Sequence, residues 1–320
     1  MSNRPAPLPD HAHRYLANIG MADDYRYFSI PCEICGSEDL EVIQDDIDIG
    51  KDRFGRLPVH GCRDCGYVFH SERFEERFYR DFYEKHYRSV LFGRTTPEKA
   101  FVADQVHRGR QLYGNIADHL SAPGRLLDVG CSCGGLMVAF RDRGWEVYGT
   151  DPDLGFAMFG RDRLKLPVDC LYAEDMQLAR ESVDLIIITG SLEHVFDLGR
   201  VLTICRQASA PDALIVVEGR ALGFSRIEGC FSHTHRRYFD RHSLPAALSR
   251  FGWVPELVTE ELLSGQTRPG GVFCIARASG AASEAPTRTR DEIAAHFLAI
   301  REDTARKLAA QGAVAVGQGG

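Results

Sequence analysis

The chain has 320 residues, a hydrophobic fraction of 44% and a formal net charge of -7. This composition is that of an ordinary globular protein with room for one sizeable α/β core and a smaller unit. The acidic balance argues against a large nucleic-acid surface, and no long apolar run or leader pattern predicts a membrane span or secretion. We therefore expect a cytoplasmic protein that acts on small molecules, with no membrane partner.

Composition shifts along the chain predict five segments. Residues 1–23 read as a proline-rich and polar arm without a clear period, and residues 24–70 as a cysteine-bearing unit. An aromatic and helical connector follows over residues 71–120, and an α/β domain over residues 121–279. Residues 280–320 are predicted to form a linker, a C-terminal helix and a flexible tail.

Two C-x-x-C pairs mark the cysteine-bearing unit: Cys32 with Cys35, and Cys62 with Cys65. Each pair can present two thiolates to one ion, and four soft thiolates suit tetrahedral zinc. The spacer between the pairs is long, so it is predicted to form a hairpin that turns near residues 52–56. A redox dithiol or a disulfide is the alternative, which a reducing cytosol disfavours. The sequence therefore predicts a structural Zn²⁺ without an open position for catalysis.

Aromatic residues are dense in the connector between Phe74 and Tyr87. One interpretation is a helix whose rings pack the domains together. In the other, Tyr83 or Tyr87 lies over a substrate. An amphipathic helix is then predicted over residues 97–120, leading into the first core strand.

A glycine-rich loop follows the apolar run at residues 126–129. Gly130 and Gly134 lack a Cβ, so the backbone can approach a ligand closely where a helix begins. The next strand ends in Asp151, about 20 residues further on, the spacing at which a carboxylate accepts from both ribose hydroxyls. A tight turn without a ligand is the alternative. We expect a nucleotide-like cofactor in this loop.

Further strands are predicted at residues 168–171, 183–189, 213–218, 253–259 and 272–276. Alternation of strands with helices indicates a parallel sheet covered on both faces, and the final two strands suit an antiparallel edge hairpin. The fold class is therefore a doubly wound α/β sheet with a small N-terminal zinc-ribbon-like unit. Ligands in such a sheet bind beyond the carboxyl ends of the strands.

Four motifs in this order resemble the class I S-adenosylmethionine-dependent methyltransferases across residues 100–278. The resemblance implies a seven-stranded Rossmann-like sheet with S-adenosyl-L-methionine as cofactor. The motifs are Asp128-x-Gly130-x-x-x-Gly134, then Asp151, then Ala173-Glu174-Asp175, then Ser191-Leu192-Glu193-His194-Val195.

The same resemblance implies roles for the motif residues. Asp128 would orient amino groups of the loop or cofactor, and Asp175 or its neighbour Glu174 would accept the adenine amino group. A solvated helix cap is the alternative for these two carboxylates. The stretch from Ser191 to His194 would lie against the methionine part of the cofactor and the substrate. Glu193 within it is a candidate catalytic residue or, alternatively, a charge at a helix N-terminus.

The loop after the fifth strand crowds ionisable and aromatic side chains together. His235, with His233 as the alternate, is the candidate general base because histidine titrates near neutral pH. Inert surface histidines are the alternative. Arg236 or Arg237 is expected to hold an anionic or phosphorylated substrate group. Tyr238 is expected to help align the acceptor.

This loop and the cysteine pairs also resemble the zinc-containing sugar C-methyltransferases. His233, His235, Tyr238 and Phe239 match their loop pattern, whereas Thr234 stands where that family has glutamate. Little sequence follows residue 279, so the large C-terminal domain of those enzymes is expected to be missing.

The predicted function is therefore in-line methyl transfer to a small molecule, such as a sugar or natural-product intermediate, with a histidine base. Two alternatives stay open. One is an RNA methyltransferase whose zinc unit grips RNA, which affinity falling steeply with salt would reveal. The other is a non-catalytic zinc-ribbon binding module.

Overall fold

The computed structural model describes residues 7–45, 57–84, 95–220, 235–268, 270–278 and 287–317. Contacts within the chain divide it into two compact units. Unit 1 takes residues 1–79, 221–243 and 287–320, and unit 2 takes residues 80–220 and 244–286. The chain therefore crosses between the units more than once. No helix in the described ranges is long and apolar enough to cross a membrane.

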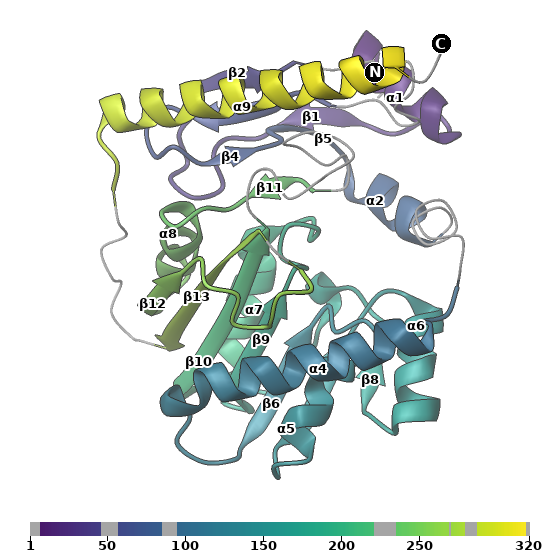
Figure 1. Cartoon of the computed structure of the whole chain (residues 1–320), viewed down its shortest axis with the longest axis vertical. Helices are drawn as coiled ribbons and strands as arrows, with labels where there is room; N and C mark the ends of the chain where they lie inside the picture. The colour runs from purple at the N-terminus through teal and green to yellow at the C-terminus, as the bar shows by residue number, and fades with distance from the viewer. Residues whose placement is uncertain are drawn as a thin grey trace, which may run out of the picture. The chain divides into compact units, whose positions relative to one another are not determined.

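A seven-stranded sheet forms the centre of unit 2, in the order β12-β13-β10-β9-β6-β7-β8 (Figure 1). Neighbours from β10 through β8 pair in parallel, whereas β13 runs antiparallel to both β10 and β12. The predicted antiparallel pair is thus confirmed. The strands are β6 (Arg125–Val129), β7 (Glu146–Thr150), β8 (Val168–Asp169), β9 (Val183–Thr189), β10 (Ser209–Arg220), β12 (Trp253–Thr259) and β13 (Gly271–Ala278).

Helices cover both faces of this sheet. Right-handed crossovers place helices on opposite faces of a sheet when the chain reverses its direction across it. Here the reversal comes after β8, because β9 lies on the other side of β6. Figure 1 shows α4 and α5 on one face with α7 behind the sheet. The predicted helix over residues 97–120 is confirmed as α4, Lys99–Ile116, with a 3-10 turn after it. The other helical elements are η3 (Gly135–Met137), α5 (Val138–Arg141), α6 (Leu154–Phe159), η4 (Gly160–Leu164), η5 (Ala173–Asp175), α7 (Leu198–Ala208) and α8 (Ser243–Arg250).

The core of unit 2 lies between α4, α5 and the sheet. Side chains of β9 and β10 alternate between the two faces, and those on the α4 face join one apolar cluster because the strands are buried on both sides. Its members include Met137, Phe140, Trp145, Leu185, Ile187, Val216 and Phe273.

Unit 1 contains a four-stranded antiparallel sheet in the order β11-β4-β3-β2 and the two-stranded pair β1-β5. Strand β2 pairs with β3, which confirms the predicted hairpin, whose turn lies outside the described residues. Its elements are β1 (Tyr27–Ser29), β2 (Leu40–Gln44), β3 (Val59–Cys62), β4 (Val68–Phe69), β5 (Glu72–Phe74) and β11 (Arg237–Tyr238). Helix α2, Glu76–Phe82, lies where an aromatic helix was predicted. The chain passes from unit 1 into unit 2 within this helix.

Helix α1, Asp10–Ile19, corrects the prediction of an arm without a periodic pattern. Gly20 ends it in the left-handed conformation, with φ of 71°, and its N–H donates to the last helical carbonyls. The polar residues between the apolar ones made the helical spacing of this segment hard to recognise in the sequence. The buried side chains recur at helical spacing: Ala12, Tyr15, Leu16 and Ile19.

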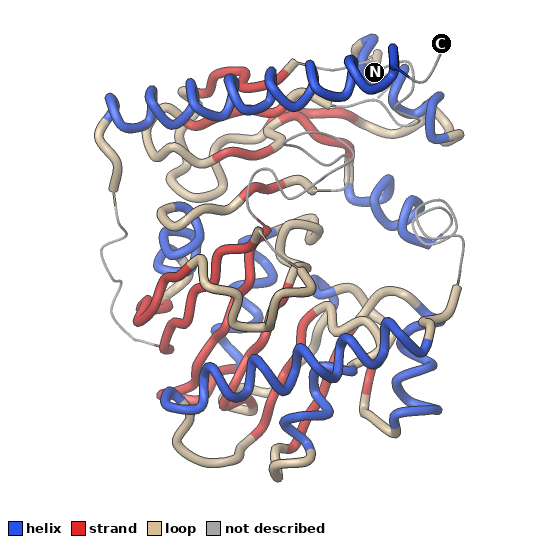
Figure 2. The backbone as a smooth tube through the Cα atoms, in the orientation of Figure 1, coloured by secondary structure: helices blue, strands red, loops and turns tan. Residues whose placement is uncertain are grey.

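The C-terminal helix α9, Arg290–Gly317, belongs to unit 1 and runs along its strands (Figure 2). Phe297 is 1% exposed and lies against Gly61 of β3, where an added Cβ would collide with the ring. The apolar residues that share this core are Ile43, Val59, Val68, Tyr238, Ile293, Phe297 and Ile300. Residues from three distant parts of the chain therefore build one small core.

Phe297→Ala should lower the free energy of unfolding of unit 1 by about 3–5 kcal/mol, because truncating a buried ring removes its transfer free energy and leaves a cavity. Leu298→Ala, at a neighbouring position that is 55% exposed, is the control and should change it by less than about 0.5 kcal/mol. Denaturant titration measures both. Equal effects of the two variants would contradict the packing of α9 on this sheet.

Candidate functional site

The loop after β6 is held in a form that exposes backbone amides. Gly130 and Gly134 have φ of 72° and 75°, in the region that favours glycine. A Cβ on Gly130 would collide with Ser191, so the loop passes tightly against the end of β9. Ser191 fixes the approach, because its Oγ donates to the carbonyl of Val129 at 2.7 Å. Residues 130 and 191, which belong to two of the four motifs, thus meet at this edge.

Asp151, at the end of β7, connects its strand to this loop. Its carboxylate accepts from the Ser132 N–H at 2.7 Å and from the Asp153 N–H at 2.9 Å. Each carboxylate oxygen has two lone pairs and can accept more than one hydrogen bond. Asp151 is 8% exposed, and this arrangement suits a ligand that presents two neighbouring hydroxyls.

Asp128 lies beneath the loop and is 2% exposed. Burial, with the nearby Asp151 carboxylate, raises the pKa of Asp128 to about 7 against the opposing effect of Arg108. A carboxyl with this pKa exists in both protonation states at neutral pH, so it can either donate or accept a hydrogen bond.

The two acidic residues expected at the adenine differ in how they are engaged. Glu174 is buried, and its Oε1 accepts from the N–H groups of Phe196 and Asp197 at 2.6 and 3.2 Å. Asp175 is exposed, and Arg80 donates to both of its oxygens at 2.7 and 3.1 Å. These bonds hold the pKa of Asp175 below its usual value. Both residues line one pocket, and Asp175 is the more exposed of the two.

Glu193 and His194 follow β9 at the same edge. The Glu193 side chain is fully buried, and neither carboxylate oxygen has a hydrogen-bond partner in the described part of the chain. Burial raises the pKa of Glu193 to about 7, with Arg220 opposing the shift. The ring of Tyr83 packs edge-on against His194, with centroids 6.3 Å apart, which brings together two of the predicted substrate residues.

A set of buried charges at this edge was not predicted from the sequence. Arg108 of α4 donates to Glu218 at 3.0 Å and to Ser264 at 3.1 Å. Arg220 lies 3.1 Å from the other Glu218 oxygen and 4.0 Å from Glu193. The side chains of these four charged residues are at most 4% exposed. With Arg268, they form what we call the buried ion cluster: Arg108, Glu193, Glu218, Arg220 and Arg268.

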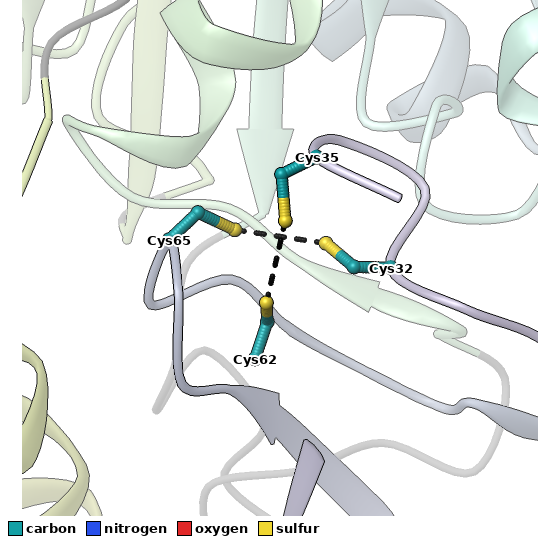
Figure 3. A group of neighbouring side chains, drawn as sticks. All are labelled: Cys32, Cys35, Cys62 and Cys65. Atoms are coloured by element: carbon teal, nitrogen blue, oxygen red, sulfur yellow. Dashed lines mark hydrogen bonds between the residues drawn. The ribbon is translucent and has the colours of Figure 1, made fainter. Parts of the chain in front are cut away.

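The four cysteine side chains of the two C-x-x-C pairs converge in unit 1 (Figure 3). The Sγ atoms of Cys32 and Cys65 are 3.6 Å apart, and those of Cys35 and Cys62 are 3.5 Å apart. All four lie within 4.8 Å of one another. Zn–S bonds of about 2.3 Å in a tetrahedron place sulfurs about 3.8 Å apart, so this donor set fits zinc. The separations are too long for disulfides, whose S–S bond is about 2.05 Å.

The segment that carries the predicted substrate loop contributes a strand to unit 1. Strand β11 pairs with β4, and the His70 N–H donates to the carbonyl of Arg236. Tyr238 is 3% exposed, with its hydroxyl 3.4 Å from the His70 Nε2. His235, before the strand, is half-buried with its ring centroid 6.4 Å from that of Tyr238. His233 and Tyr87 lie outside the described residues.

The two arginines of this segment are held by protein groups. Arg237 is fully buried and donates to both oxygens of Glu33, at 2.6 and 3.0 Å. Arg73 donates to the same carboxylate at 3.2 Å, and together the arginines lower the pKa of Glu33 to about 2. Arg236 is 4% exposed and stacks on Tyr79 at 3.9 Å. Arg237 was expected to hold a substrate anion. Its guanidinium instead pairs with Glu33 of the first cysteine loop.

Comparisons with known proteins agree with this fold. A family model described as a methyltransferase domain matches residues 99–258, which is half of the chain. The chain belongs to this methyltransferase domain family.

Two relatives and one solved structure illustrate the similarity. The ubiquinone biosynthesis O-methyltransferase of Rhodopseudomonas palustris strain HaA2 is 34% identical over 98 residues, which are 29% of this chain and 38% of that protein. The same enzyme of Nitrobacter winogradskyi is 34% identical over 96 residues, 28% of this chain and 36% of that protein. The chain thus spans well under half the length of these relatives.

The solved structure is the Burkholderia thailandensis 1,6-didemethyltoxoflavin-N1-methyltransferase, crystallised with 1,6-didemethyltoxoflavin and S-adenosylhomocysteine. It is 15% identical and has a TM-score of 0.51, covering 74% of this chain and all of that one. At this identity the likeness is one of fold.

Cys62→Ser should release one zinc per chain and destabilise unit 1, because a tetrahedral thiolate site loses a ligand while unit 2 keeps its own core. Elemental analysis of protein purified without chelator measures the metal. Cys170→Ser, at an exposed cysteine outside the cluster, should keep a full complement of zinc. Wild-type protein without zinc would contradict the site.

Proposed function

We propose that the protein is an S-adenosylmethionine-dependent methyltransferase that methylates a small molecule. The observation that carries this proposal is the loop geometry at the carboxyl edge of the unit 2 sheet. Asp151 accepts from the N–H groups of Ser132 and Asp153, which places a carboxylate and the loop amides together at this edge. Membership of the methyltransferase domain family supports the same conclusion.

The residues at this edge fit the parts of the cofactor. Asp151 would hold the ribose hydroxyls, and the exposed Asp175 would accept the adenine amino group. Gly130 and Gly134 adopt the left-handed conformations of the loop, and their missing Cβ atoms let it pack against Ser191 and Met137. Ser191 and Asp128 would line the methionine part. Bound S-adenosylmethionine would supply a methyl group on a sulfonium, which is already activated for displacement.

The chain's own contribution is then to position the acceptor, to exclude water and to take up its proton. His235, with His233 as the alternate, is the proposed base because a neutral imidazole can accept a proton. Tyr83 and His194 are proposed to contact the acceptor. Tyr238 is 3% exposed, and its packing against His70 and His235 suits a role in positioning the base.

The finer proposal is that the acceptor is a sugar or a natural-product intermediate. It rests on the two cysteine pairs together with His233, His235 and Tyr238, which follow the pattern of the zinc-containing sugar C-methyltransferases. In this proposal zinc is structural, because four cysteine ligands leave no open coordination position.

Asp151→Ala should weaken binding of S-adenosylhomocysteine by at least about tenfold, because each lost charge-assisted hydrogen bond costs about 1.5–3 kcal/mol before water compensates. Titration calorimetry measures the affinity. Asp169→Asn, at an exposed carboxylate bonded to Tyr148, is the matched control and should bind normally. Unchanged affinity in Asp151→Ala would exclude the ribose assignment.

His235→Ala should lower methyl transfer by about 10²–10⁴-fold and leave S-adenosylhomocysteine affinity intact, because a general base acts on the acceptor's proton. The readout is mass detection of products heavier by one methyl group after incubation with metabolite pools. His107→Ala, at an exposed histidine of α4, is the control. Normal turnover in a His233/His235 double variant would eliminate the histidine base but not the methyltransferase assignment.

A further inference from the structure

The buried ion cluster carries more positive charge than its carboxyls neutralise. It holds three arginines, and of its two carboxyls only Glu218 has ion pairs of 3.0 and 3.1 Å. Burial raises the pKa of Glu193 to about 7, with Arg220 opposing the shift. Burying a charged group is costly unless it is paired, so members of the cluster without a close partner in the described ranges are candidate positions for binding a ligand.

Arg268 is the arginine that an anion can reach. Its side chain is half-buried, and its guanidinium makes no ion pair or hydrogen bond in the described part of the chain. Arg220 donates to its backbone carbonyl at 3.4 Å, which fixes the loop between β12 and β13 over the cluster. Burial, together with Arg108 and Arg220, lowers the pKa of Arg268 to about 10. Glu218 and the half-exposed Asp104 of α4 oppose this lowering of the Arg268 pKa.

Glu193 is the second group in the cluster that lacks a hydrogen-bond partner in the described ranges. Both of its oxygens are buried without a hydrogen-bond donor in the described ranges, and the nearest cation is Arg220 at 4.0 Å. A carboxyl left in this state costs free energy unless a ligand donates to it or it is protonated. Arg268 and Glu193 together therefore mark a place built for a polar ligand.

This place is connected to the loop after β6 through helix α4. The Arg268 guanidinium lies 6.0 Å from the ring of Phe101, which packs edge-on against Phe156 of α6. Helix α6 begins three residues after Asp151. On the same stretch of α4, a Cβ added to Gly135 would lie 2.6 Å from the Cβ of Gln105, so α4 packs directly on the loop that follows β6.

We propose that Arg268, backed by Arg220, binds an anionic group of a small-molecule ligand at the carboxyl edge of the sheet. The inference rests on the proposed function, which supplies the class of ligand. The anionic group of that ligand is a carboxylate or a phosphate. That group is either the carboxylate of the cofactor's amino-acid part or an anion on the methyl acceptor. Arg268 thereby takes the role that the sequence suggested for Arg236 and Arg237, which Tyr79 and Glu33 engage.

The test compares wild type with Arg268→Gln by titration calorimetry with three probes. S-adenosylhomocysteine carries the carboxylate, 5′-methylthioadenosine lacks the amino-acid part, and inorganic phosphate stands in for an acceptor anion. If the anion is the cofactor carboxylate, Arg268→Gln weakens S-adenosylhomocysteine by about 10–100-fold and leaves methylthioadenosine unchanged. If it belongs to the acceptor, both nucleosides bind normally, and phosphate binding to the S-adenosylhomocysteine complex is lost.

Two further variants serve as controls. Arg180→Gln removes a charge at an exposed position of unit 2 and should bind every probe as wild type does. Arg268→Lys keeps the charge and should retain part of the lost binding, which a merely unfolded variant would not. The inference is overturned if Arg268→Gln matches Arg180→Gln in every titration, or if both nucleosides weaken equally. Wild type that binds neither nucleoside refutes the proposed function, and phosphate titration of the free protein still tests Arg268.

Discussion

The candidate site depends on the pairing of the Asp151 carboxylate with backbone N–H groups of two segments. The Ser132 N–H belongs to the loop after β6, and the Asp153 N–H caps the turn into α6. Parallel strands bring their carboxyl ends to one edge, where loops leave amides without partners. One carboxylate satisfies these amides and fixes the loop before a ligand arrives, so less ordering entropy opposes binding.

Buried charge is the second constraint on this edge. Arg108 and Arg220 both pair with Glu218 inside unit 2, and these pairs offset part of the cost of removing the charges from water. Truncating one member would leave another buried and unpaired. In unit 1, Glu33 plays the comparable part between Arg73 and Arg237. That pairing connects the first cysteine loop to β11, so the cysteine cluster and β11 belong to one structural unit.

Local pattern predicted much of the fold. The apolar run of β9, the helical period of α4 and the glycine loop beside Asp151 each depend on neighbours within a few residues, and each was located correctly. The sequence analysis missed features that depend on distant partners. Helix α9 packs on β2, and β11 pairs with β4, through contacts between residues far apart in the chain. The partners of Arg108 and Arg237 are equally distant. Glu218 and Arg220, two charges ending an apolar strand, were the available hint of a buried network.

In the proposed function, the loop after β6 and Asp151 together hold the ribose of S-adenosylmethionine or its demethylated product. A crystal structure of the protein grown with S-adenosylhomocysteine tests this assignment most directly. We expect both ribose hydroxyls within about 3 Å of the Asp151 oxygens, the usual hydrogen-bond range, with the nucleoside along the loop that begins at Gly130. Electron density for the nucleoside elsewhere, or a ribose with no contact to Asp151, would contradict it.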